Sequence, residues 1–143
     1  MTFLISDDRE FLATKALAFA ARIETLPDGT TRRWLMLEDF AVEGRLFARM
    51  DAAQPQVLTP QQACRVAILM PDGYPTTKLD SFYTFPRLVR VDGVDPINAN
   101  GEMDICGQKF QFWSRHLDNT EWRPGQDGLE TYVNYVRREL RAA

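Results

Sequence analysis

The spacing of hydrophobic residues in the first third of the chain is typical of a short helix followed by paired strands. Ser6 precedes two acidic residues and an apolar pair, which predicts a helix of two or three turns. A Ser side chain can accept hydrogen bonds from free helix amides, and acids suit the positive end of the helix dipole. Apolar and polar positions alternate over residues 19–24, and a turn at 27–30 leads into residues 33–37, all apolar except Arg33. This pattern predicts a β-hairpin.

The middle of the chain contains one strongly apolar run and a long polar segment. Residues 64–70 are apolar, partly β-branched and followed by a Pro-Asp-Gly turn, so they predict a central strand. Another extended stretch is expected at 45–50, before the proline-bearing segment 51–60. From Tyr74 to Gly107 we expect largely ordered loop, with one short extended piece at 82–85. Loops of this length inside a compact domain tend to be functional.

The C-terminal part has helical periodicity, with Asp127 as the expected cap. Apolar residues recur there at spacings of three and four residues: Leu129, Tyr132, Val133, Val136 and Leu140. The last turn carries three arginines, which suit the negative end of the helix dipole. The order of helix, antiparallel meander, long loop segment and helix predicts an α+β fold, in a single domain over residues 1–143.

The composition and net charge of the chain give no support for nucleic acid or membrane as a binding partner. The 17 basic and 20 acidic side chains give a net charge of −3, which provides no general attraction to nucleic acid or to an anionic membrane. No stretch reaches the roughly 20 apolar residues that span a bilayer, and the first residues lack the pattern of an export signal. We therefore expect a cytoplasmic protein that binds neither nucleic acid nor membrane.

The chain has two cysteines and one histidine. Cys64 and Cys106 are far apart in a chain without an export signal, which favours reduced thiols over a disulfide. A zinc site needs clustered cysteines and histidines, so no metal site is predicted. Cys64 begins the apolar run, where a free cysteine is usually buried, whereas Cys106 lies among turn residues. Cys106 is therefore the better candidate for an accessible nucleophile.

Several polar residues near Cys106 could assist acyl transfer. Asn98 or Asn100 could hold an oxyanion with its amide, although asparagine in such a turn also has a purely conformational role. His116 could accept a proton or could be a structural histidine among aromatic residues. Three carboxylates could orient an amine or be solvated loop charges: Asp95, Asp104 and Asp118. A serine hydrolase built on Ser114 has little support, because the chain lacks a Gly-x-Ser-x-Gly motif.

Three stretches resemble ubiquitin-conjugating enzymes, in particular a prokaryotic branch found beside bacterial ubiquitin-like proteins. "ILMPDGYPTTKLDSFYTFP" is similar to a strand of that family, its P-x-x-Y-P element and the next strand, in which Tyr74 and Pro75 would pack beneath the active-site loops. "DPINANG" resembles the His-Pro-Asn segment and Asn-Gly turn that precede the catalytic cysteine. Trp122 and Pro124 match the W-x-P element before the C-terminal helix. The resemblance covers about residues 65–140.

This resemblance implies a ubiquitin-conjugating-enzyme-like fold and a carrier role. Cys106 would receive a ubiquitin-like modifier from an activating enzyme as a thioester and pass it to an amine of a target protein, with Asn98 and His116 assisting. No cofactor is needed at this step, because ATP is spent upstream. Systems of this kind are often linked to defence against phage.

Two features depart from the family pattern. Asp95 stands at the family's histidine position, and Trp122 follows Cys106 by 16 residues, which is longer than usual. Either an insertion follows Cys106, or the nucleophile has moved or been lost; alignment on Trp122 would put Ser114 near the family's cysteine position. The alternative to an enzyme is a catalytically inactive module of the same fold that binds the modifier or a partner protein.

Overall fold

The structure is a computed structural model that describes residues 3–43, 45–49, 58–117 and 121–143. Its elements are α1 (Ser6–Thr14), β1 (Phe19–Thr25), β2 (Thr31–Ala41), β3 (Phe47–Arg49), β4 (Leu58–Pro60), β5 (Ala63–Leu69), β6 (Phe82–Phe85), β7 (Leu88–Val89), β8 (Gly101–Ile105), β9 (Gln108–Trp113) and α2 (Leu129–Ala142). The predicted α+β class, with a helix at each end of an antiparallel meander, is confirmed. Neither helix of the described chain has the length and hydropathy needed to cross a bilayer.

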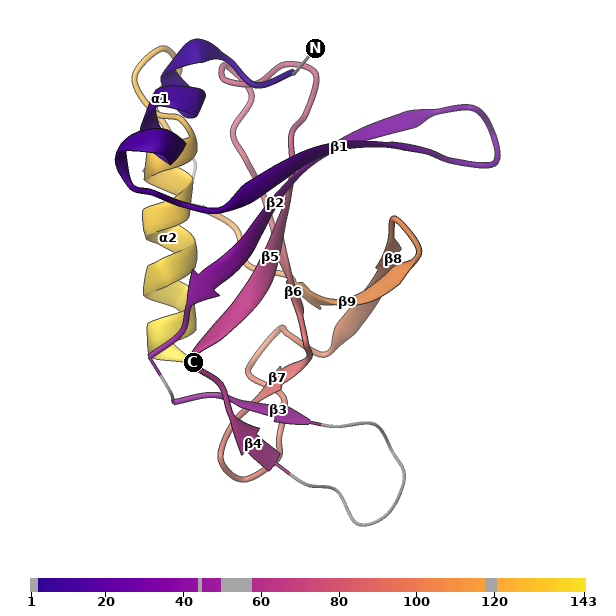
Figure 1. Cartoon of the computed structure of the whole chain (residues 1–143), viewed down its shortest axis with the longest axis vertical. Coiled ribbons are helices and arrows are strands. Elements are labelled where there is room, and N and C mark those ends of the chain that lie inside the picture. Colours follow the sequence, from indigo (N-terminus) through magenta and orange to yellow (C-terminus); the bar gives the residue numbers. More distant parts are fainter. Residues whose placement is uncertain (1–2, 44, 50–57, 118–120) are drawn as a thin grey trace.

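A six-stranded antiparallel sheet forms the body of the fold. Its strand order is β1-β2-β5-β6-β9-β8, and a smaller sheet has the order β4-β3-β7. The predicted hairpin is confirmed as β1 and β2, and the apolar run 64–70 is confirmed as β5, a central strand. Figure 1 shows α2 along one side of the large sheet, with α1 across its upper end and the β8–β9 hairpin at the opposite edge.

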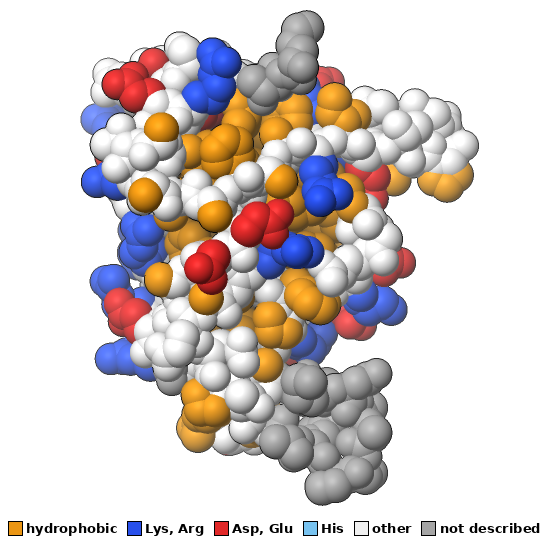
Figure 2. All heavy atoms as spheres, in the orientation of Figure 1, with side chains coloured by type: hydrophobic (Ala, Val, Ile, Leu, Met, Phe, Trp, Pro, Cys, Tyr) orange, Lys and Arg blue, Asp and Glu red, His pale blue; other side chains and the backbone are white. Residues whose placement is uncertain are grey.

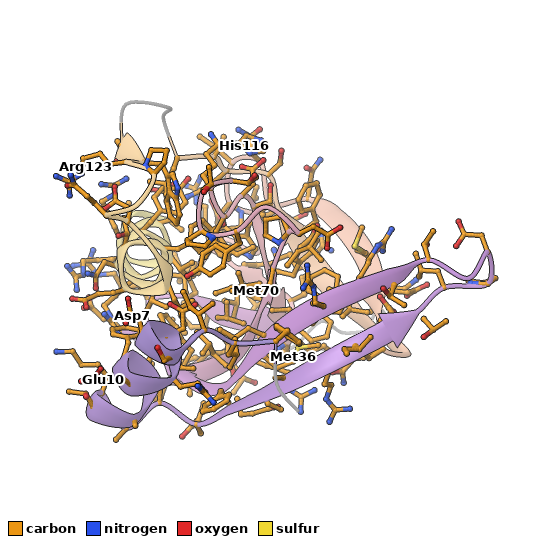
Figure 3. The ribbon with its side chains drawn as sticks, turned by 90° about the horizontal axis from the view of Figure 1, so that it is seen from above. Asp7, Glu10, Met36, Met70, His116 and Arg123 are labelled. Atoms are coloured by element: carbon orange, nitrogen blue, oxygen red, sulfur yellow. The ribbon has the colours of Figure 1, made fainter. Side chains whose placement is uncertain are left out.

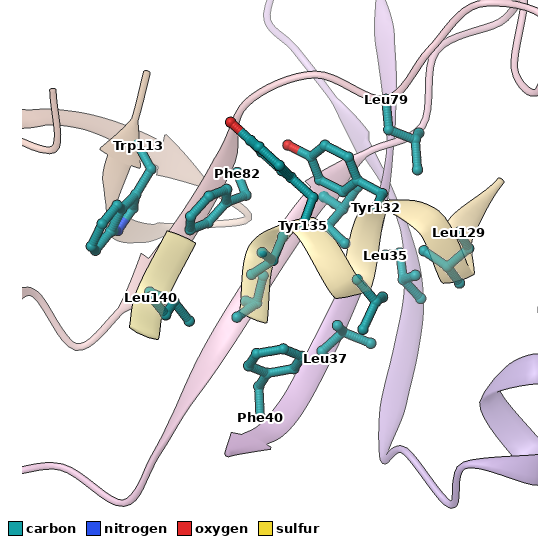
Figure 4. Close-up of a cluster of buried hydrophobic side chains, with 14 of the residues drawn as sticks. Leu35, Leu37, Phe40, Leu79, Phe82, Trp113, Leu129, Tyr132, Tyr135 and Leu140 are labelled. Carbon is teal, nitrogen blue, oxygen red and sulfur yellow. The ribbon is translucent and has the colours of Figure 1, made fainter. Parts of the chain in front are cut away.

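Buried side chains lie on both faces of the large sheet, because the sheet curls. Leu35 and Leu37 of β2 face α2 and join the main core, part of which is shown in Figure 4. Trp34 and Met36, at the alternate positions of β2, join a second cluster with Tyr83, Ile105 and Phe110. Since side chains alternate across a strand, the continuous apolar stretch of β2 supplies both clusters. The β8–β9 hairpin thus helps to cover the face of the sheet that α2 leaves open.

The side chain of Gln111 joins four segments inside the main core. Its Oε1 accepts from the Thr84 hydroxyl at 2.9 Å and the Leu88 amide at 2.8 Å, and its Nε2 donates to the carbonyls of Leu88 at 2.9 Å and Ala99 at 2.8 Å. Trp113 Nε1 donates to the Thr84 hydroxyl at 2.8 Å, which extends the network. Gln111 is 2 % exposed, and all its hydrogen-bonding positions are used. The network holds the base of the β8–β9 hairpin against β6 and β7.

The long segment from Tyr74 to Gly107 is mostly loop, as expected, and contains the expected strand β6. It also contains β7 and β8, which were not expected. The Asn-Gly pair at 100–101 does not make a hairpin turn. Asn100 precedes β8, Gly101 begins it, and the turn lies at Cys106 and Gly107. The alternation of exposed and inward positions in β8 is present in the sequence, within the stretch expected to be loop.

The residue that precedes each helix differs by one position from the expected cap. α1 begins at Ser6 itself, after Ile5, without a side-chain cap. α2 is preceded by Gly128, while Asp127 closes the preceding turn by accepting from the Arg123 amide at 2.6 Å. The Leu129 amide at the start of α2 lowers the pKa of Asp8 of α1, against the effect of burial. The Asp8 carboxylate therefore lies near the positive end of α2.

The charged surface is mixed in sign. Figure 2 shows Lys and Arg side chains interspersed with Asp and Glu over one face. The arginines near the end of α2 have structural partners, as Arg138 pairs with Glu121 at 3.3 Å and Arg141 with Glu43 at 3.0 Å. These pairs agree with a structural role for the arginines of α2.

We predict that Gln111→Met lowers the free energy of unfolding by about 3 kcal/mol or more, because buried partners in three other segments lose their hydrogen bonds. Urea unfolding would measure the change. Lys109→Met is the matched control, since Lys109 is exposed on the same strand and its loss should change stability by about 0.5 kcal/mol or less. Equal effects of the two substitutions would contradict the stabilising role of the network.

Candidate active site

Cys106 occupies the first position of a two-residue hairpin turn between β8 and β9. Its φ is 49° and that of Gly107 is 82°, which is the conformation of a type I′ turn. Asn, Asp and Gly are the residues that suit such a position, and a cysteine gains nothing from it. The thiol is exposed and unpaired. The conformation of the turn therefore gives no reason for a cysteine at this position.

Glu24 of β1 is the nearest charged neighbour of this turn. Its Oε2 accepts from the Cys106 amide at 2.8 Å, and its Oε1 accepts from Trp34 Nε1 at 3.0 Å. Partial burial raises the pKa of the Cys106 thiol, the Glu24 carboxylate raises it further, and Arg22 opposes the shift. No pattern in the sequence points to this contact, because Glu24 precedes Cys106 by 82 residues.

Cys64 has the opposite environment. It is 4 % exposed on β5, and burial raises the pKa of its thiol to about 12. A thiol with such a pKa is protonated at neutral pH and unreactive. The expectation that Cys64 is buried in the apolar strand and Cys106 accessible is confirmed.

The predicted helpers of Cys106 lie at the other end of the hairpin. Asn98 is exposed with a φ of 58°, and its carbonyl accepts from the Ser114 amide at 2.8 Å. Asn100 precedes β8, and its carbonyl accepts from Arg87 at 3.1 Å. The five residues of β8 separate both asparagines from the thiol by about 17 Å, at about 3.3 Å per residue. The structure does not bring either amide side chain to Cys106.

His116 follows β9 and is likewise at the base of the hairpin. Its Nδ1 contacts the Asp80 carboxylate and lies 3.5 Å from the Ser81 hydroxyl. Figure 3 shows His116 on the opposite side of the view from the β1–β2 hairpin, which carries Glu24. Asn98, Ser114 and His116 therefore form one group and Cys106 with Glu24 another.

The three carboxylates considered from the sequence have different environments. Asp95 is bound by Arg87 through two hydrogen bonds, at 3.0 and 2.8 Å. Asp104 is exposed on β8, two residues before the thiol. Asp118 lies outside the described residues.

The residues of the two structural motifs meet between α1 and the start of α2. Trp122 Nε1 donates to the Pro75 carbonyl at 3.1 Å, and the rings of Tyr74 and Trp122 are 6.4 Å apart. The Tyr74 hydroxyl donates to the buried carboxyl of Asp8 at 2.7 Å. Pro124 is exposed in the turn that follows. Tyr74, Pro75 and Trp122 thus fix the segment that leads into α2.

The comparison with protein families matches nearly all of the chain. A family described as Prokaryotic E2 family E matches residues 4–143. The chain belongs to this family. Prokaryotic E2 membership supports a conjugating-enzyme-like role and implies an activating enzyme and a modifier as partners. Neither the search of curated proteins nor that of solved structures returned a match.

We predict that Tyr74→Phe in this E2-family protein lowers the free energy of unfolding at pH 7 by about 1–2 kcal/mol. Burial raises the pKa of Asp8, and the Tyr74 hydroxyl opposes that shift by stabilising the carboxylate. The loss should therefore be largest where Asp8 is ionised and should shrink as the pH falls through the raised pKa. Urea unfolding of both proteins at several values between about pH 4 and about pH 7 would measure this loss of stability.

Tyr132→Phe is the control for this substitution. The Tyr132 hydroxyl is buried and has no hydrogen-bond partner among the described residues, so its removal should leave stability unchanged or raise it. A loss in Tyr132→Phe as large as that in Tyr74→Phe would contradict the assignment of the effect to the bond with Asp8.

We predict that iodoacetamide labels Cys106 of the native protein much faster than Cys64, as followed by peptide mass. Glu24→Gln should increase the labelling rate of Cys106 near neutral pH by about two- to fivefold and shift its pH profile downwards, because one cause of the raised pKa is removed. Glu102→Gln, which changes a carboxylate elsewhere on the hairpin, should leave the rate unchanged. Labelling of both cysteines at one slow rate would argue against an accessible nucleophile.

Proposed function

We propose that this protein carries a ubiquitin-like modifier as a thioester on Cys106 and transfers it to an amine of a target protein in the cytoplasm. The observation that carries the proposal is the exposed thiol at a turn position that favours other residues, in a chain of the prokaryotic E2 family. Among the two cysteines, Cys106 alone is accessible to a protein-bound thioester.

The proposed reaction has two acyl transfers. In the first, the Cys106 thiolate attacks the thioester carbonyl of the modifier, a new C–S bond forms, and the thiolate of the activating enzyme leaves. In the second, a neutral amine attacks the new thioester, an amide forms, and the Cys106 thiolate leaves. The thiol and the attacking amine each have to lose a proton.

Glu24 is the group proposed to receive such a proton, because it contacts the residue that carries the thiol. Its carboxylate already contacts the Cys106 amide, and the Gly107 amide has no partner among the described residues. That second amide is available to an oxyanion formed at Cys106. In this proposal Glu24 acts as a proton acceptor and the Gly107 amide stabilises the oxyanion.

Asn98 and His116 have an indirect role in this proposal. The resemblance implies that they assist, but about 17 Å of β8 separates Asn98 from the thiol. They can act on the reaction where a bound modifier or target extends along the hairpin to its base. Substitution of each residue would then slow transfer to the amine more than loading of Cys106.

A second candidate function is a binding module that presents the modifier without forming a thioester. It is favoured by the raised pKa of Cys106 and by the distance of the thiol from Asn98 and His116. In that case the family fold is retained and the thiol is incidental. The proposed biological setting, defence against phage, rests on the resemblance alone under either function.

We predict that the protein forms a reducible adduct when incubated with an activating enzyme, a ubiquitin-like modifier and ATP. A non-reducing gel and intact mass should show one modifier added, lost in Cys106→Ala and retained in Cys64→Ala. Absence of the adduct, with the activating enzyme charged in the same tube and the modifier still bound, would establish the binding module instead.

A further inference from the structure

β8 is an edge strand that leads directly to the exposed thiol. It pairs with β9 and is the last strand in the order of the large sheet, so its other edge is unpaired among the described residues. Four of its five residues are exposed or half-buried, and Ile105 alone is buried. An unpaired edge of this kind can receive an extended segment of another chain as an additional strand.

The turn geometry determines which peptide groups of β8 face outwards. Ile105 and Gln108 flank the two-residue turn, so they form the hydrogen-bonded pair that closes the hairpin. Hydrogen-bonded pairs alternate along an antiparallel ladder. The peptide groups of Glu102 and Asp104 therefore point away from β9 and are the ones that an added strand would meet.

The side chains of β8 indicate the chemistry of such a strand. Glu102 and Asp104 are exposed on one face, whereas Met103 and Ile105 belong to the second hydrophobic cluster on the other. Glu102 lies 3.6 Å from Arg87, and Asp104 has no ionic partner among the described residues. The complementary segment has cationic side chains at alternate positions and apolar ones between them. Two copies of β8 would instead oppose acid to acid, which disfavours self-association.

We propose that the free edge of β8 binds the extended C-terminal tail of the ubiquitin-like modifier and delivers its carbonyl carbon to Cys106. The inference rests on the proposed function. β8 runs towards the thiol, so a tail whose last residue reaches Cys106 must lie parallel to β8. In this register one tail residue lies opposite Glu102 and the second residue after it lies opposite Asp104. The tail residue two positions further on then lies opposite Cys106. Backbone pairing would supply the affinity, and the two acids would select a basic tail.

A pentapeptide thioester tests this arrangement without an activating enzyme. The probe is acetyl-Arg-Val-Arg-Val-Gly as its thioester with mercaptoethanesulfonate. Attack by the Cys106 thiolate forms the peptidyl thioester and releases mercaptoethanesulfonate, and intact mass follows the loading rate. In the parallel register the valine amides face β8 and the arginine amides face away. N-methylation of both valines should slow loading about tenfold, whereas N-methylation of both arginines should leave it unchanged.

Substitutions in the protein provide an independent test of the strand pairing. Asp104→Pro removes an outward amide and keeps the ladder with β9, so it should reduce the loading rate about as much as valine methylation. Asp104→Asn keeps the amide and should slow only the basic peptide, relative to acetyl-Glu-Val-Glu-Val-Gly thioester. A thermal melt of Asp104→Pro would verify folding, and the methylated peptides test the native chain if this variant unfolds.

The outcomes separate this inference from the proposed function. If the probe loads Cys106 at the same rate whichever amides are methylated and whatever stands at position 104, the strand pairing is wrong while the thioester chemistry stands. If no peptide loads Cys106, binding of the free acid peptide to Cys106→Ala is measured by fluorescence anisotropy. If the peptide binds and methylation of its valines abolishes binding, the edge site is retained and the carrier function is overturned. If the peptide does not bind, the edge site is overturned as well.

Discussion

The buried amide of Gln111 is the interaction on which the arrangement of this protein's C-terminal half depends. One side chain satisfies backbone groups of Leu88 and Ala99 and the hydroxyl of Thr84, so β6, β7, β9 and the segment before β8 are joined in the core. A buried polar group is costly unless all of its partners are present, which makes this arrangement specific as well as stabilising. The β8–β9 hairpin consequently extends from a fixed base, and the position of its turn is determined.

The far end of the hairpin is held by a different kind of contact. The large sheet curls until the turn at Cys106 reaches Glu24 on β1, the opposite edge strand. Trp34 shares that carboxylate and packs edge-on against Tyr83, with ring centroids 5.4 Å apart. The exposed thiol is therefore connected to the second hydrophobic cluster through one acidic residue. A core of two clusters thus positions a surface group that neither cluster contains.

Local patterns predicted most of the fold, because they are set by neighbours in the sequence. The alternation about residues 27–30 and the apolar run 64–70 identify strands β1, β2 and β5 without any knowledge of packing. The β8–β9 hairpin has the same alternation, but its turn places cysteine where Asn or Asp is expected, and the preceding Asn-Gly pair suggested a turn elsewhere. The exposure of Cys106 was predicted; its contact with Glu24 depends on the curl of the sheet and has no local signal.

The environment of Cys106 has a consequence for its reactivity. A thiol with a raised pKa is mostly protonated near neutral pH, so it reacts slowly with oxidants and alkylating agents even though it is exposed. In the proposed reaction the same carboxylate that disfavours the thiolate can accept the thiol proton when a thioester is held beside it. The thiolate that does form is also a stronger nucleophile than one of low pKa. Reactivity would then depend on a bound partner that brings the carbonyl to the turn, rather than on a histidine or an asparagine stationed beside the sulfur.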